Sequence, residues 1–227
     1  MTAKPAMVRV GRLKIPLQSA VEWVRDYTDA DRNAAGPRPY AYPAYDEFDW
    51  ENNLPARLSD ADLLAPVLLN VGLSIRAFYG LRRIRDRLEH GLANPDLRRP
   101  LAEIEDQQQI SRMVEPLYGL LDDPETKPWG VAGTTLSKIL HRKAPHALVL
   151  HDRWVRACYV GDGGPVPSAR NRSWADYMTA MTAAIGQDIR SQGAAFTQLD
   201  AATGRPGQLS HVRLLDLVAW KSKGAAG

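Results

Sequence analysis

Helical spacing with capping residues is the feature that most constrains how this chain can fold. Ser59 and Asp62 match a capping box, and Leu63 opens the apolar run that follows them. Three more serines stand where they can cap helices: Ser74, Ser173 and Ser210. With apolar residues three and four apart, these signals predict helices after Ser59 and Asp152 and at about 18–27, 75–89, 97–107, 109–121, 135–142, 174–190 and 210–221. The spacing therefore predicts an all-α fold.

Two segments depart from the helical pattern. Residues 8–15 alternate roughly between apolar and polar around Gly11, which predicts a short β-strand or hairpin in an N-terminal appendage at 1–17. Residues 30–57 are dense in Pro, Tyr and Asp and have no period, so we expect a long irregular loop there. Its aromatic residues could stack on bases, but packing over the helical core is the favoured interpretation for all five: Tyr40, Tyr42, Tyr45, Phe48 and Trp50.

The composition is that of an ordinary globular protein. Of the 227 residues 44% are apolar and 24% charged, so we expect one core in a single domain over 1–227. No apolar run approaches the roughly 18 residues that cross a membrane, and a charged N-terminal segment argues against a signal peptide. Cys158 is the one cysteine, which predicts a core thiol and a cytoplasmic location. A net charge of +3 leaves both nucleic acids and small molecules open as partners.

The stretch 130–152 concentrates the residues that could carry chemistry. Gly130 and Gly133 allow a tight turn whose backbone amides begin a new helix and can bind anions. Residues 127–156 hold six basic residues against one acidic residue, which suits a phosphate backbone. Three of the basic residues lie in or next to the helix: Lys138, Arg142 and Lys143. On physical grounds alone, a plain helical hairpin with a solvated basic face is the simpler interpretation.

Asp152 closes this stretch and stands in front of another predicted helix. An aspartate at that position commonly caps the helix by accepting hydrogen bonds from its first amides. A carboxylate held in this way could also stabilise a cationic sugar transition state or activate water. The two roles are compatible, because a capping side chain has a fixed orientation.

The ungapped run Gly130-Val131-Ala132-Gly133-Thr134-Thr135, with Asp152 twelve residues after Leu140, resembles the helix-hairpin-helix signature of the DNA base-excision glycosylases of the endonuclease III superfamily. The resemblance implies a helix-hairpin-helix unit at 109–160 that binds duplex DNA and cleaves the bond between a flipped base and its sugar. It implies that Asp152 is the catalytic carboxylate. It assigns DNA-backbone binding to eight residues: Gly130, Val131, Gly133, Thr134, Thr135, Lys138, Arg142 and Lys143.

Departures from that signature narrow the expected chemistry. Thr134 occupies the position of the lysine nucleophile of bifunctional members, so the resemblance implies a hydrolase without lyase activity. Ala132 stands in place of the second hairpin glycine, and Trp129 in place of proline. One cysteine cannot hold an iron–sulfur cluster, and no cofactor is expected. Three histidines lie five apart, which does not match metal-ligand spacing, so we expect no metal site and surface or phosphate-facing positions for His141, His146 and His151.

The whole chain also resembles a group of uncharacterised actinobacterial proteins, through the segments LSDADLLAPVLLN, KILHRKAP and HVRLLDLVAWK. That likeness supplies no activity. Two alternatives to a glycosylase therefore stay open. One is a non-catalytic helix-hairpin-helix nucleic-acid binder in which Asp152 is only a cap, and the other is a helical protein with no nucleic-acid function. No membrane partner is expected in any of the three cases.

Overall fold

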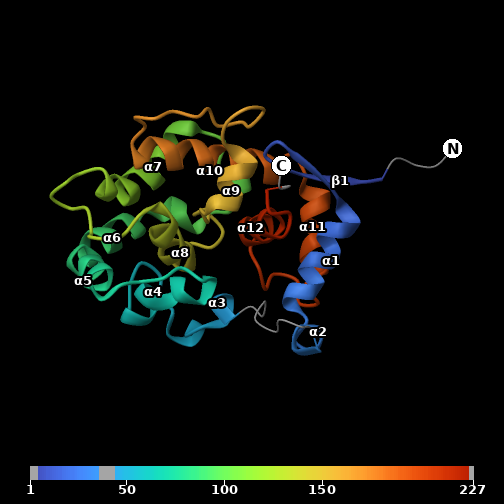
Figure 1. Ribbon diagram of the computed structural model, residues 1–227, viewed down its shortest axis with the longest axis horizontal. Coiled ribbons are helices and arrows are strands. Elements are labelled where there is room, and N and C mark those ends of the chain that lie inside the picture. Colours follow the sequence, from blue (N-terminus) through green and yellow to red (C-terminus); the bar gives the residue numbers. More distant parts are fainter. Residues whose placement is uncertain (1–4, 36–43, 225–227) are drawn as a thin grey trace.

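The fold is mainly helical. The computed structural model describes residues 5–35 and 44–224, and these residues form twelve α-helices and a two-stranded sheet, joined in places by 3-10 turns (Figure 1). The helices are α1 (Leu17–Thr28), α2 (Ala30–Ala35), α3 (Ala44–Glu47), α4 (Asp60–Leu64), α5 (Ile75–Arg83), α6 (Arg85–Leu92), α7 (Gln107–Tyr118), α8 (Gly133–Lys143), α9 (Arg153–Tyr159), α10 (Trp174–Arg190), α11 (Gly193–Ala201) and α12 (His211–Lys221). Within the described residues, no helix has the length and apolar character needed to cross a membrane.

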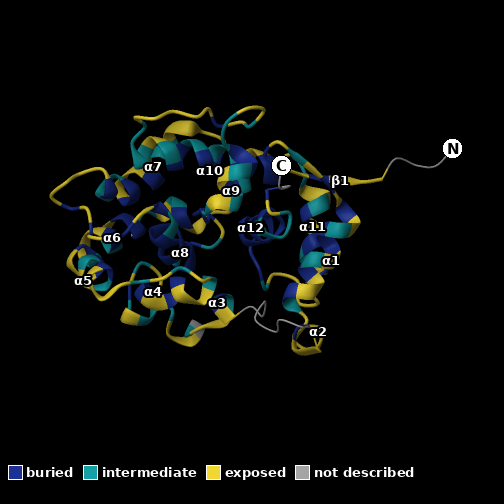
Figure 2. Cartoon of the chain, in the orientation of Figure 1, coloured by how far each residue is buried: buried dark blue, intermediate teal, exposed yellow. Residues whose placement is uncertain are grey.

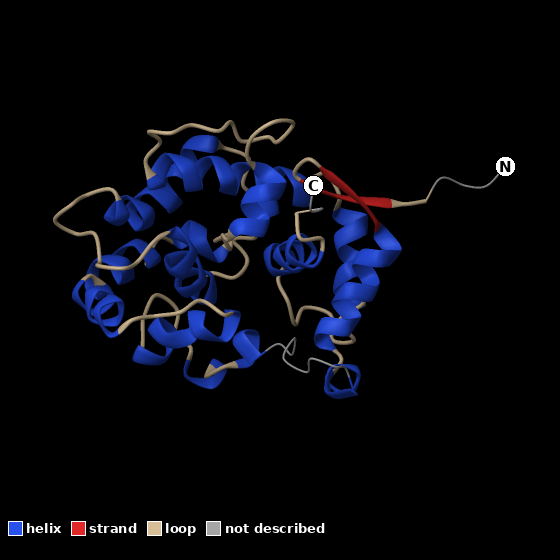
Figure 3. Cartoon of the chain, in the orientation of Figure 1, coloured by secondary structure: helices blue, strands red, loops and turns tan. Residues whose placement is uncertain are grey.

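The predicted N-terminal hairpin is present. Strands β1 (Met7–Val10) and β2 (Leu13–Pro16) pair in antiparallel fashion, with Val8 opposite Ile15 (Figure 3). Gly11 turns the chain with φ of 60°, and a Cβ at this position would lie 2.2 Å from the carbonyl oxygen of Cys158. Its amide donates a hydrogen bond to Asp188 of α10 over 2.7 Å. Gly11 is therefore required for two reasons. The turn needs a positive φ, and Cys158, 147 residues further along the chain, leaves no room for a Cβ.

The capping signals predicted the helix starts well. Ser59 and Asp62 form a reciprocal capping box at α4, as expected. Ser74, Ser173 and Ser210 each accept a hydrogen bond from the amide three residues ahead, and begin α5, α10 and α12. These starts are set by local chemistry, so they could be predicted from a few residues each.

Three predictions about the elements were wrong. The helix expected at 75–89 is divided at Ile84, where φ and ψ of −100° and 7° separate α5 from α6. The helix expected at 97–107 is replaced by two 3-10 turns, because Pro100 forces an extended conformation on Arg99 before it. The loop expected at 30–57 contains α2, α3 and a 3-10 turn, Trp50–Asn52. Helix α11 was not predicted.

The packing interpretation is confirmed for Tyr45, which is buried, and does not hold for Phe48, which is 40% exposed. Tyr40 and Tyr42 lie outside the described residues. Cys158 is buried in the core, as predicted, and burial raises the pKa of its thiol to about 11.

Helices α8 and α12 lie in the interior and are covered by the other helices. Both are largely dark blue in Figure 2, and α10 packs along α7 while α1 packs against α12. For α12 this matches the sequence, since most of HVRLLDLVAW is apolar. For α8 it does not, because GTTLSKILHRK carries polar or charged side chains on every face. The buried polar atoms of α8 must therefore find partners inside the protein.

Candidate functional site

The basic end of α8 is held inside the protein rather than presented to solvent. Arg142 donates hydrogen bonds to the backbone oxygens of Tyr45 and Phe48 over 2.8 and 2.5 Å, and its Nε lies 3.3 Å from Asp62. Lys143 places its Nζ 2.6 Å from Asp62 and 2.6 Å from the side-chain oxygen of Asn53. The exposed basic face expected from the sequence is therefore wrong for these two residues, whose charges are already satisfied.

Asp62 explains why two cations can be buried at this point. Its carboxylate accepts hydrogen bonds from the capping box of α4 and also faces Arg142 and Lys143. Burial alone would raise its pKa, but the hydrogen bonds from Lys143 and Ser59 outweigh burial and hold the pKa below the usual value. The pairing joins residues 44–54, α4 and the last turn of α8.

A cavity of about 600 Å³ lies between α8 on one side and α1 and α12 on the other. Thr134 and Lys138 of α8 line it, as does Asp152 at the start of α9. The remaining lining residues are Tyr27, Leu68, Leu69, Asn70, Val71, Arg153, Trp154, Arg213, Asp216 and Trp220. A volume of this size is in the range of small-molecule sites, roughly 300–1,000 Å³.

Asp152 caps α9 and also lines this cavity. Its Oδ1 accepts hydrogen bonds from the amides of Trp154 and Val155 over 2.8 and 2.9 Å. No described residue donates to its Oδ2, and the side chain is partly exposed. The capping role expected from the sequence is confirmed, and one oxygen remains for another partner.

Lys138 is the charged residue of α8 that lines the cavity, and it is deeply buried. Only 3% of its surface is exposed, and among the described residues no hydrogen bond or ion pair reaches its Nζ. Burial lowers the pKa of its ammonium group, while the charges of Asp216 and Asp152 act in the opposite direction. Its expected position on an exposed backbone-binding face is therefore wrong, because it belongs to the cavity.

Asp216 was not predicted as a site residue. It is paired with Arg213 one turn earlier on α12, and its second oxygen, Oδ1, is buried without a hydrogen-bond partner among the described residues. Burial raises the pKa of this carboxyl group. The signal in the sequence is a pair of opposite charges three apart within an otherwise apolar helix, which indicates a buried pair rather than a solvated face.

Thr134 connects the cavity to a buried histidine. Its hydroxyl lies 3.4 Å from Nδ1 of His151, whose Nε2 lies 3.0 Å from the hydroxyl of Tyr177. Burial lowers the pKa of His151 to about 4. His141 is also buried, with Nδ1 2.7 Å from the carbonyl oxygen of Leu148, so the surface positions expected for these two histidines are wrong. His146 is exposed, and residues 5–35 and 44–224 contain no cluster of metal-ligating side chains.

The turn before α8 presents backbone and aromatic surface to solvent. Gly130 has φ of 71° and packs beside Ser74 and Ala77 of α5. Trp129 is 68% exposed, and the guanidinium of Arg76 lies 4.3 Å from the centre of its ring. The N-cap residue, Ala132, offers no side-chain acceptor, so the first amides of α8 have no capping partner in the described part of the chain.

The side chains of this turn mostly face inward. Val131 and Thr135 are buried, and Gly133 packs directly under the indole of Trp174. Of the predicted backbone-binding residues, Gly130 is exposed and Thr134 is partly exposed at the cavity. Any ligand of this turn would therefore meet main-chain atoms and the indole of Trp129 rather than the side chains of Val131 and Thr135.

Comparison with known proteins gives one match. The model of a family described as "Family of unknown function (DUF6308)" matches residues 20–223. No curated protein and no solved structure matches the chain.

Proposed function

We propose a function from the residues of the chain itself, because the chain belongs to DUF6308, a family of unknown function. The protein binds duplex DNA and hydrolyses the N-glycosidic bond of a flipped base. One observation carries the proposal. Asp152 is fixed by two amides of α9 through one oxygen and directs the rest of its carboxylate toward a cavity of about 600 Å³.

The cavity offers what the chemistry requires. Cleavage of an N-glycosidic bond develops positive charge on the sugar, which a fixed carboxylate stabilises without reorganising. Tyr27, Trp154 and Trp220 supply aromatic surface that suits stacking against an extruded base. In this proposal Asp152 stabilises the sugar cation and orients the attacking water.

The turn 119–132 between α7 and α8 is the proposed hairpin of a helix-hairpin-helix unit. Its support is the uncapped start of α8, where main-chain amides can bind a phosphate. Exposed cations lie close by: Arg76 stacks on Trp129, and Arg83 reaches toward the carbonyl oxygen of Lys127. Arg142 and Lys143 are left out of the proposed DNA contacts, because their side chains are paired with Asp62 inside the protein.

The test is a screen of duplexes carrying varied base lesions for abasic-site formation, followed by the Asp152→Asn variant on any active substrate. Asparagine keeps the cap, so the fold and DNA binding should be retained while base release falls by at least about a hundredfold. Asp106→Asn is the matched control. Asp106 also caps a helix, α7, through the amide of Gln108, but it lies outside the turn 119–132 and does not line the cavity, so base release should be unchanged.

Equal base release by wild type and Asp152→Asn would refute the role of Asp152. Salt-dependent duplex binding with no release from any substrate would favour a non-catalytic nucleic-acid binder. That alternative has its own support, because helix capping fully accounts for the Oδ1 contacts of Asp152. Absence of duplex binding at low salt would exclude both.

A further inference from the structure

Lys138 differs in its surroundings from the other lysines that the structure describes. Lys14, Lys127 and Lys223 are exposed to solvent, and Lys221 is partly exposed. Lys143, one turn after Lys138, is as deeply buried but is held by Asp62 and Asn53. Lys138 combines deep burial with an Nζ that has no direct partner among the described residues, and it lines a cavity. Because Lys138 lines the cavity and no described residue holds its Nζ, the amine is placed to meet a molecule bound there.

The groups around this amine favour its neutral form while keeping proton acceptors near it. Burial lowers the pKa of Lys138, and Arg213 acts in the same direction. The carboxyl groups of Asp152, Asp216 and the more distant Asp46 oppose this. Asp216, on the α12 side of the cavity, carries a buried oxygen without a hydrogen-bond partner in the described chain. A lysine desolvated in this way is the usual form of an amine that attacks carbonyl compounds.

We propose that Lys138 is a nucleophile that forms an imine with an aldehyde or ketone bound in the cavity between α8 and α12. The inference does not depend on DNA as the substrate. The cavity walls set the class of ligand: the aromatic rings of Tyr27, Trp154 and Trp220, with Leu68 and Leu69, suit a carbonyl compound with a flat or apolar body.

The reaction balances with the groups present. The lone pair of Nζ attacks the carbonyl carbon, a C–N bond forms, and the electrons of the C=O π bond move to oxygen. A proton passes from nitrogen to that oxygen by way of a cavity carboxyl group, which gives a carbinolamine. The cavity carboxyl group then gives a proton to the hydroxyl, which leaves as water as the nitrogen lone pair forms the C=N bond, and the carboxylate takes back the remaining N–H proton. One water is released, and neither an oxidant nor a reductant is used.

The experiment compares lysines within one molecule. The full chain is incubated at pH 7 with benzaldehyde and sodium cyanoborohydride, which reduces an imine to a stable amine, and labelling is mapped by peptide mass spectrometry. A lowered pKa raises the neutral, reactive fraction of an amine at pH 7. We therefore expect Lys138 to label faster than Lys14 and Lys127, with Lys143 unlabelled.

Labelling of the exposed lysines at rates equal to or above that of Lys138 would overturn the proposal. The comparison needs no variant, so misfolding cannot confuse it. Lys138→Met should remove the fast-labelling site and leave labelling of Lys14 and Lys127 unchanged.

A second arm replaces benzaldehyde with a duplex containing an abasic site, whose sugar carries an aldehyde, and traps with borohydride. A protein–DNA adduct at Lys138 would identify that sugar as a ligand, whereas adducts at other lysines in both arms would refute the assignment.

The proposed function and the proposed role of Lys138 can be refuted independently of each other. Benzaldehyde contains no base and no phosphate, so its reaction with Lys138 reports only on the amine. Loss of base release in Asp152→Asn reports only on the carboxylate.

Discussion

At the scale of single residues, the unexpected feature is the number of ionisable side chains that the core accepts. His141, Arg142 and His151 are all buried, although each was expected at the surface. Each meets a specific partner, and for two of them the partner comes from a distant segment: Tyr45 for Arg142 and Tyr177 for His151. Local spacing carries no information about such partners, so it predicted a solvated face. Asp152 was predictable because its partners are the next amides in sequence.

The two buried histidines predict how stability depends on pH. Burial lowers the pKa of both His141 and His151 from 6.5 to about 4. Between those values the unfolded chain binds protons that the folded chain does not, so stability should fall as the pH falls from 6.5 toward 4. Urea unfolding at pH 7, 6 and 5 measures this slope, and His151→Gln should make it shallower.

His146→Gln provides the control for that experiment. His146 is exposed, so its replacement should leave the pH slope as it is in the wild type. An unchanged slope in His151→Gln as well as in His146→Gln would show that His151 is protonated in the fold.

At the scale of elements, the start of α8 is shaped by a contact with α10. A Cβ on Gly133 would lie 2.1 Å from the indole of Trp174, which also packs edge-on against His151 and Tyr177. The glycine pair at 130–133 was interpreted from sequence as a turn for binding anions. The structure gives Gly130 the turn role, through its positive φ, and gives Gly133 a packing role. The difference depends on a tryptophan 41 residues away, which no local pattern indicates.

Gly133→Ala should therefore destabilise the protein by about 1–3 kcal/mol, the usual cost of an overpacked site. Gly193→Ala is the matched control, since Gly193 is also the first residue of its helix and a Cβ there would meet nothing within 4 Å. It should be neutral or stabilising by up to about 1 kcal/mol. Chemical denaturation of both variants measures the difference, and equal stabilities would show that Trp174 moves aside at no cost.

Helix boundaries also fall into two kinds: those that local residues predict and those that depend on tertiary packing. The starts of α4, α5, α10 and α12 follow serine caps and were predicted. The break at Ile84 has no glycine or proline to mark it, and the buried residues Ala77, Leu81, Ile84 and Leu88 keep helical spacing across it. Such a break depends on what the helices pack against, which is a tertiary property.

At the scale of the whole molecule, the formal charge of +3 is a poor guide to the surface. Arg142, Lys143 and Arg213 are paired in the interior, so they do not contribute an exposed basic patch. The exposed cations nearest the proposed hairpin are Arg76, Arg83 and Lys127. The proposed DNA-binding face is therefore smaller than the basic stretch seen in the sequence and is placed differently.

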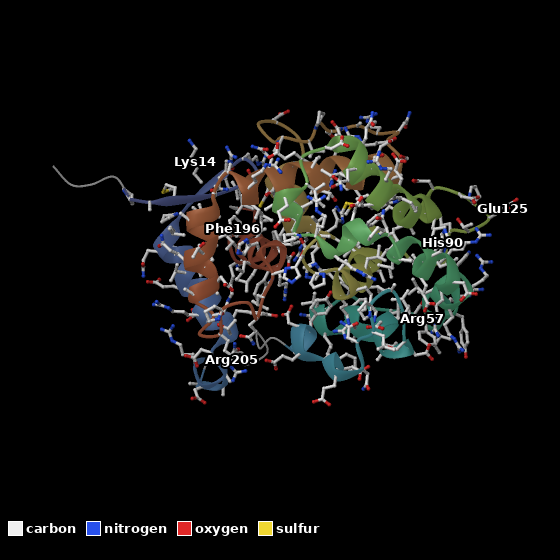
Figure 4. All side chains as sticks on the ribbon, turned by 180° about the vertical axis from the view of Figure 1, so that it is seen from behind. Lys14, Arg57, His90, Glu125, Phe196 and Arg205 are labelled. Carbon is white, nitrogen blue, oxygen red and sulfur yellow. The ribbon has the colours of Figure 1, made fainter. Side chains whose placement is uncertain are left out.

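This arrangement predicts which cations control the salt dependence of duplex binding. Replacing Arg76, Arg83 and Lys127 singly with glutamine should weaken binding and reduce the slope of log K against log salt by up to about 1 each. Arg205→Gln is the control, because Figure 4 shows Arg205 at the end of the molecule opposite Glu125 of the hairpin loop. Fluorescence anisotropy at several salt concentrations measures the slopes. A larger effect at Arg205 would move the proposed face elsewhere.

Tyr45 has a consequence for how sequences of this family can vary. Its carbonyl oxygen accepts a hydrogen bond from Arg142, and its hydroxyl donates to the carbonyl oxygen of Lys138. The cavity amine is thus positioned from behind by a residue that never touches the cavity, in a segment without regular spacing. We therefore expect Tyr45, Asp62 and Arg142 to vary together among members of the family, because a change at one leaves the others without a partner.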